Sequence, residues 1–230
     1  MAVAFDAKGT ASQHNAVSVT SFTYTGLTVG PLNNTVLAVT LAFGANVSAV
    51  SAHWDSAGTN QAMTQIVTAN ATTNNAYVFI FGLIAPTTGN KTLSVSWTTS
   101  SDYCVDAVSF TGADQSAIGT TFKNTTSTAV TASSTPSQLP ITITSPTNDM
   151  AIAAWASSPV AWDATGITGT NIFVDTTAVS AAADYISGSG TTVSPSIRAT
   201  DITSGGQWVA VGCDIAAVSA ADVLMAQACM

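Results

Sequence analysis

The chain has 230 residues, a formal net charge of −8 and only four Lys and Arg residues, whereas 63 residues are Thr or Ser. So few cations cannot neutralise the phosphates of nucleic acids or the head groups of an anionic membrane, so both are excluded as partners. The hydrophobic fraction of 47% is sufficient for a buried core. Because Glu is absent and Lys and Arg are scarce, the composition favours β-structure over helices.

Strands are predicted wherever β-branched and aromatic residues recur between turn residues. Alternation is clearest in 91–98, where Leu93, Val95 and Trp97 share one face. In chain order, the predicted strands are 17–25, 35–43, 47–54, 61–68, 76–84, 91–98, 103–111, 139–144, 149–156, 170–174, 193–199 and 207–217. About a dozen short strands at this spacing predict an all-β antiparallel sandwich. We expect one domain over residues 1–217 and a tail over 218–230, either helical or extended.

A faint internal repeat relates the two parts of the chain. Residues 28–38 resemble residues 143–153, with Pro31 on Pro146 and Leu37 on Ile152. One interpretation is a pair of similar halves, 17–115 and 130–217, packed on one core. The alternative is that strands rich in Thr, Val and Ala resemble each other through composition alone.

Neither a membrane span nor an export signal is predicted. The most apolar run, 76–85, is about half as long as the ~20 residues that a spanning helix needs. The first ten residues contain no basic region followed by an apolar stretch, so we expect synthesis in a host cytoplasm without a signal peptide.

Three cysteines, at positions 104, 213 and 229, do not form a disulfide framework. Cys104 and Cys213 lie in strand-like segments and are expected in the core. A bridge between them would require neighbouring strands.

Catalytic residues are not predicted. His14 is expected in a polar N-terminal loop, His53 lies at a strand end, and the chain has no G-x-S-x-G sequence. Paired aspartates, such as Asp102 and Asp106, are the remaining route to an enzyme, a glycoside hydrolase. We therefore expect a non-enzymatic protein.

We expect no cofactor and no metal site. Calcium is the alternative, because hard cations bind carboxylates. The candidate ligands lie in separate loops, outside any D-x-D-x-D-G sequence; they are Asp55, Asp102, Asp114, Asp163 and Asp175.

Two Trp-Asp pairs are the candidate ligand site. Trp54–Asp55 and Trp162–Asp163 both lie at predicted loop edges. An aromatic ring next to a hydrogen-bond acceptor suits the apolar face and the hydroxyl groups of a sugar. The alternative is that both tryptophans merely cover an end of the sandwich. Trp97 and Trp155, by contrast, are expected to lie in the core.

Four segments carry a resemblance to a known family. They are a strand containing Tyr77, the turn P-T-T-G at 86–89, the strand end V-S-F-T-G-A-D-Q at 108–115, and the closing strand W-V-A-V-G-C-D-I at 208–215. Together they resemble a β-sandwich module of bacteriophage virion proteins and bacterial surface proteins.

The resemblance implies a jelly-roll-like fold, a surface or adhesive role and no catalytic residues. We therefore expect a structural protein on the virion surface, such as a capsid decoration protein or a head or tail fibre component. Its expected partners are the major capsid protein or another virion protein, further copies of itself, and host-surface glycans. The alternative is a carbohydrate-binding module or lectin-like adhesin that uses Trp54, Asp55, Trp162 and Asp163.

Overall fold

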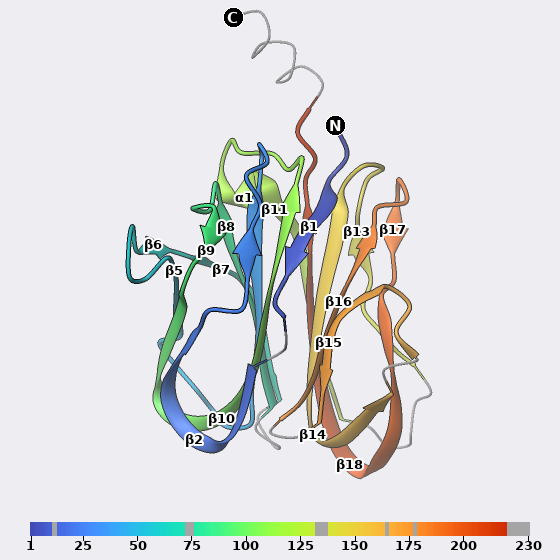
Figure 1. Cartoon of the computed structure of the whole chain (residues 1–230). Coiled ribbons are helices and arrows are strands. Elements are labelled where there is room, and N and C mark those ends of the chain that lie inside the picture. The colour runs from blue at the N-terminus through green and yellow to red at the C-terminus, as the bar shows by residue number, and fades with distance from the viewer. Residues whose placement is uncertain (11–12, 72–75, 132–137, 164–165, 177–178, 220–230) are drawn as a thin grey trace, which may run out of the picture.

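The computed structural model describes residues 1–10, 13–71, 76–131, 138–163, 166–176 and 179–219. For 13, 15–17, 131, 158–163 and 199–206 it describes the backbone only. The protein is all-β and antiparallel, as predicted, and its strands form two curled lobes that lie side by side (Figure 1). No helix among the described residues has the length and apolarity needed to cross a membrane.

The first lobe is built on an eight-stranded sheet with the order β6-β5-β10-β4-β8-β7, in which β1 and β2 also pair with β10. Its strands are β1 (Ala4–Lys8), β2 (Gln13–Tyr24), β4 (Val36–Phe43), β5 (Ser51–Trp54), β6 (Gln61–Ala62), β7 (Thr64–Ala71), β8 (Ala76–Ile84) and β10 (Leu93–Thr111).

The two predicted strands 91–98 and 103–111 form one long strand, β10. The polar residues between them have the composition of a turn, but they form the bend at which the sheet curls (Figure 1). At that bend the register of β10 against β2 shifts between Ser96 and Ser101.

The second lobe is built on a six-stranded sheet with the order β11-β18-β14-β16-β15, in which β12 also pairs with β18. Its strands are β11 (Phe122–Thr131), β12 (Leu139–Pro140), β14 (Met150–Asp163), β15 (Thr170–Asp175), β16 (Ser180–Ser187) and β18 (Ser196–Ile215). Two small pairs, β3 (Thr28–Val29) with β9 (Gly89–Asn90) and β13 (Ile143–Thr144) with β17 (Thr192–Val193), complete the lobes. The short helix α1 (Ile118–Thr121) precedes β11.

The two sheets share a strand order. The order of β1 and β2, β10, β4, β8 and β7 in the first lobe has its counterpart in β11, β18, β14, β16 and β15 in the second. The buried residues and left-handed asparagines correspond too: Leu27 with Ile141, Val29 with Ile143, and Asn34 with Asn148.

This correspondence corrects the register read from the sequence. Leu37 lies in the core of the first lobe, whereas Ile152 lies between the sheets. Since side chains alternate between the faces of a strand, an alignment that is wrong by one residue exchanges the faces. The structural counterpart of Leu37 is therefore Ala151, which faces the core of the second lobe.

Three apolar layers hold the molecule together. The middle layer lies between the sheets and joins Val36, Ile80 and Phe110 of the first to Ile152 and Val211 of the second; we call it the shared layer. Each lobe encloses a further core inside its curl. The continuous apolar runs of β4 and β8 follow from this arrangement, because these strands are buried on both faces.

Cys104 and Cys213 are free and buried in the shared layer, one on each sheet. At the end of the described chain, Ala216 donates its N–H to Thr121 O and Val218 donates its N–H to Gly112 O. The rest of the predicted tail, 220–230, lies outside the described residues.

Candidate functional site

The first Trp-Asp pair belongs to the core and to a turn. Trp54 has an exposed fraction of 0%, and its indole N–H donates to Thr87 O at 2.8 Å. Its ring is therefore enclosed in the core of the first lobe, where no sugar can stack on it.

Asp55 organises the turn between β5 and β6. Its Oδ2 accepts from the N–H and the hydroxyl of Thr59, and it lies 3.7 Å from Lys91 Nζ. The backbone hydrogen bond from Thr59, together with the weaker effect of Lys91, lowers the pKa of Asp55 despite its burial. This carboxylate already has partners within the chain.

The second pair lies on another sheet. Trp162 and Asp163 end β14, whereas Trp54 ends β5 of the first lobe. In the ladder, Trp162 pairs with Ala199 and Asp163 with Arg198. The side chains of Trp162 and Asp163 lie outside the described residues.

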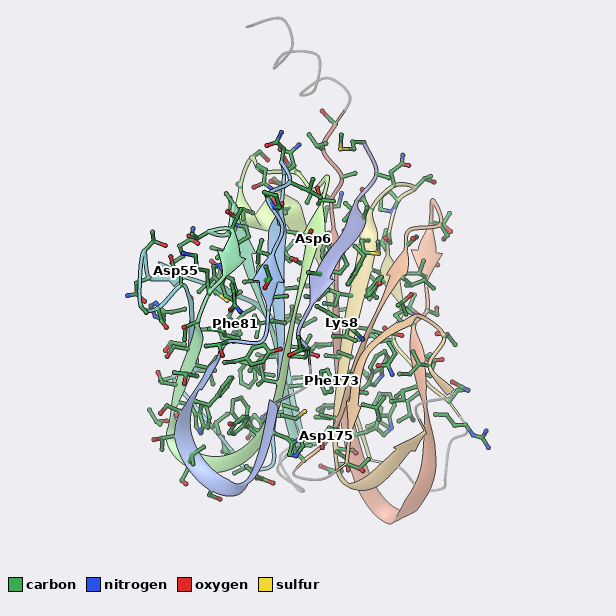
Figure 2. The ribbon with its side chains drawn as sticks, viewed as in Figure 1. Asp6, Lys8, Asp55, Phe81, Phe173 and Asp175 are labelled. Atoms are coloured by element: carbon green, nitrogen blue, oxygen red, sulfur yellow. The ribbon has the colours of Figure 1, made fainter. Side chains whose placement is uncertain are left out.

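His14 is in strand β2 rather than in a loop, and it contacts the other lobe. Its Nδ1 lies 2.6 Å from Asp175 Oδ2 on β15, and the neighbouring residue across the ladder is Cys104. Figure 2 shows Asp175 and Lys8 on the seam between the lobes and Asp55 on the outer side of the first lobe. Lys8 Nζ donates to the carbonyls of Asn171 and Ile172 across the same seam.

A Cys-His-Asp set at this seam does not have the properties of a nucleophile. Cys104 has an exposed fraction of 0%, and burial raises the pKa of its thiol well above the usual value. A catalytic cysteine needs the thiolate and access for its substrate. His14 and Asp175 are therefore better described as a link between the lobes.

The candidate calcium ligands are dispersed. Among the described residues, no group of three or more His, Cys or Asp side chains could hold a metal ion. Asp114 accepts from the N–H and hydroxyl of Ser116 in the turn before α1, and Asp175 contacts His14. Asp106, the proposed partner of Asp102, has an exposed fraction of 2%, so it cannot reach a polysaccharide.

An open hollow of about 390 Å³ lies at the edge of the first lobe, between the loop after β4 and the strands β7 and β8. Its volume falls within the range of small-molecule sites. The lining residues are all uncharged; they are Val47, Ser48, Ala49, Val50, Gln65, Thr68, Ala69, Asn70, Tyr77 and Phe79.

The alternation of β7 and β8 explains the lining. Thr68 lies opposite Phe79 and Asn70 opposite Tyr77, so these polar side chains border the aromatic row of β8. Gln65 reaches the same side because a bulge between Gln65 and Val67 changes the alternation. Asn70 Nδ2 lies 3.4 Å from the Tyr77 hydroxyl, to which it donates.

The hollow suits a neutral ligand that has both an apolar face and hydroxyl groups. Phe79 is held edge-on against Phe43, with ring centroids 5.7 Å apart, so the aromatic floor is fixed. Gln65 and Asn70 supply donors and acceptors. We refer to this feature as the β7–β8 hollow.

Comparisons with protein-family models and with curated proteins give no match. The candidate site therefore depends on geometry alone. Sequence reasoning missed the β7–β8 hollow because it searched for exposed tryptophans. The signal in the sequence was the aromatic alternation of 77–81, together with the polar residues Gln65, Thr68 and Asn70 of the strand before it.

Proposed function

We propose that this chain is a non-enzymatic structural protein displayed on the surface of a bacteriophage particle, as a capsid decoration protein or a head or tail fibre component. The observation that carries the proposal is the shared layer, which joins two curled sheets into a thick slab. The described residues leave only four large hydrophobic side chains exposed, so the outer surface is dominated by small and polar groups; the four are Met1, Phe5, Leu32 and Val130.

The sheet edges support lateral assembly. The first sheet has edges at β6, at β7 and at β1 and β2, which pair only with β10, and the second has edges at β11 and β15. Edge strands offer backbone N–H and C=O groups, and natural proteins commonly protect such edges with charges. This chain has few charges, so we infer that a major capsid protein, another virion protein or further copies of this chain cover its edges in a repeated assembly.

Reconstitution on particles tests the proposal. Phage particles prepared without this protein should lack a regular surface density, and adding the purified protein should restore it in cryo-EM maps. Particles that show the same surface density with and without the protein would refute the role.

A second candidate function is binding of neutral glycans in the β7–β8 hollow. The uncharged lining, with aromatic rings on the floor and amides at the rim, favours it. A decoration protein could use such binding to adhere to host-surface glycans, so the two functions are compatible.

A glycan array followed by calorimetry tests this second function. Asn70→Ala and Gln65→Ala should each weaken glycan binding at least tenfold, whereas Asn33→Ala, an exposed asparagine outside the hollow, should bind as the wild type does. Equal affinities in all three variants would exclude the hollow as the binding site.

A further inference from the structure

Three ionisable side chains from adjacent strands converge at one end of the second sheet. Lys123 lies on β11, Asp214 on β18, and Asp149 immediately before β14. Lys123 Nζ lies 3.0 Å from Asp149 Oδ2 and 3.7 Å from Asp214 Oδ2. The ladder fixes this arrangement, because β18 runs between β11 and β14 and places Asp214 opposite Lys123.

The carboxyl groups of Asp149 and Asp214 are buried, and one oxygen of each is held by a hydrogen bond. Asp214 has an exposed fraction of 0% and Asp149 one of 6%. Asp149 Oδ1 accepts from the Ala217 N–H at 2.8 Å, and Asp214 Oδ1 accepts from the Ser145 hydroxyl at 2.6 Å. The other oxygen of each, Oδ2, is buried without a hydrogen bond and is the oxygen near Lys123.

We propose that Lys123 and Asp149 form an intramolecular amide bond between Nζ and Cγ, with Asp214 relaying the protons. The Ala217 N–H polarises the Asp149 carbonyl at Oδ1, as a donor in an oxyanion hole does, which makes Cγ electrophilic. The short distance from Nζ to Asp149 keeps the reacting groups in contact, which replaces a bimolecular encounter.

The reaction is a condensation that needs no oxidant or co-reactant. Two protons leave the Lys123 ammonium group, its lone pair attacks Cγ of Asp149, and the C–Oδ2 bond breaks. Both protons arrive on Oδ2, which departs as water. Burial, together with its contacts to Asp149, raises the pKa of Asp214 to about 7 despite Ser145 and Lys123. Asp214 can therefore give and take a proton near neutral pH.

The first lobe provides an internal comparison. There the positions of Asp149 and Asp214 are occupied by Thr35 and Ser109, and Asp6 lies near the position of Lys123. Asp6 Oδ2 accepts from Ser109 Oγ at 2.7 Å and from the Gly30 N–H at 2.9 Å. Hydrogen bonds therefore close this end of the first lobe, whereas the second lobe has an amine next to a carboxyl.

The amide bond would tie β11, the first strand of the second lobe, to the start of β14 across the terminal strand β18. Such a cross-link joins β11 and the start of β14 covalently on either side of β18. The inference is independent of the proposed function, because it concerns the covalent structure of the chain alone.

Mass spectrometry of the full-length protein under denaturing conditions tests the proposal. The wild type should be lighter than its sequence mass by one water molecule. Trypsin should leave Lys123 uncleaved, giving residues 92–198 as one peptide that also lacks one water. Lys123→Arg and Asp214→Asn should both restore the full mass, whereas Lys91→Arg, the matched control, should keep the water loss.

Treatment with hydroxylamine distinguishes the amide from an aspartyl succinimide, which also lacks one water but is opened by this reagent. The proposed amide bond between Lys123 and Asp149 should survive the treatment. Circular dichroism of Lys123→Arg and Asp214→Asn should show the β-sheet spectrum. This control shows that the variants lack the amide bond although they are folded. A wild-type mass equal to the sequence mass, or a water loss that persists in Lys123→Arg, would overturn the proposal.

Discussion

Buried aspartates are the unusual residues of this chain. Asp106, Asp184 and Asp214 are each nearly or fully buried, and burial raises the pKa of each to about 7. An ordinary protein pairs buried carboxylates with Lys or Arg, but this chain has only four such residues. Protonation and hydrogen bonds therefore take over part of the role of ion pairs in the interior.

Asp184→Asn should reduce the loss of stability at high pH. Burial raises the pKa of Asp184 from 3.8 to about 7, outweighing the hydrogen bond from the Gly169 N–H. Between these values the folded protein binds more protons than the unfolded chain, so the free energy of unfolding falls as pH rises. The cost at pH 8 is on the order of 4 kcal/mol, at about 1.4 kcal/mol per pKa unit. Urea unfolding at pH 5 and pH 8 should show a smaller pH difference in the variant.

Asp114→Asn is the control, because the pKa of Asp114 is shifted in the opposite direction to that of Asp184. Burial raises the pKa of Asp114, but hydrogen bonds from Ser116, Thr120 and Gln115 together outweigh it and lower the pKa, so the ionised form stabilises the fold. This variant should lose stability at pH 8. An Asp184→Asn variant with the pH dependence of the wild type would contradict the assignment.

Trp54→Phe should destabilise the protein rather than remove a ligand. The substitution leaves Thr87 O without the indole N–H that it accepts at 2.8 Å, and it leaves space in the core. The expected loss is roughly 1–3 kcal/mol in the free energy of unfolding, measured by urea denaturation. Unchanged stability with loss of glycan binding would instead restore Trp54 as a contact residue.

The sequence correctly predicted the burial of a side chain where the alternation of apolar residues determines which face of a strand it lies on. Trp97 and Trp155 are buried in the cores, as their apolar neighbours indicated. Trp54 was expected at a loop edge, because its burial involves a contact with Thr87, 33 residues further along the chain, which periodicity does not reveal. The meeting of Lys123, Asp149 and Asp214 could not be predicted either, because it depends on the order of β11, β18 and β14.

At the scale of elements, the bent strands β10 and β18 define the architecture. One neighbour follows both parts of each strand, β2 along β10 and β14 along β18, whereas the other neighbour changes from β5 to β4 and from β12 to β11. Each bent strand curls one sheet over its own core (Figure 1). β16 was missed in the sequence because three consecutive alanines follow its first residue, Ser180, and alanine is depleted in strands. The small side chains fit because β16 is buried on both faces. That burial depends on tertiary contacts.

A methyl group added at Gly82 tests how closely the lobes pack. A Cβ there would lie 2.8 Å from a ring carbon of Phe122, which belongs to the other lobe. Gly82→Ala should therefore lower the free energy of unfolding by about 1–3 kcal/mol through overpacking. The thermal midpoint should fall accordingly.

Gly119→Ala in α1 is the matched control, because no heavy atom lies within 4 Å of its added Cβ. It should leave stability unchanged or raise it, since Ala favours a helix. Equal stability of Gly82→Ala and Gly119→Ala would show that β8 and β11 are not in close contact.

At the scale of the whole molecule, the shared layer makes the two lobes dependent on each other. Separating them would expose Val36, Ile80, Ile152 and Val211 to water. The cost of exposing apolar surface is roughly 25 cal/mol per Å², so neither lobe should persist alone. His14 with Asp175 and Lys8 with the β15 carbonyls add polar links along the seam.

Unfolding followed by fluorine NMR of protein labelled with 5-fluorotryptophan tests this dependence most directly. Trp54 and Trp97 report on the core of the first lobe, and Trp155 and Trp208 on that of the second. Because the shared layer joins the lobes, all four resonances should lose their native intensity at one urea concentration. Two separate midpoints, one for each lobe, would show that the lobes are independent domains and would contradict the account.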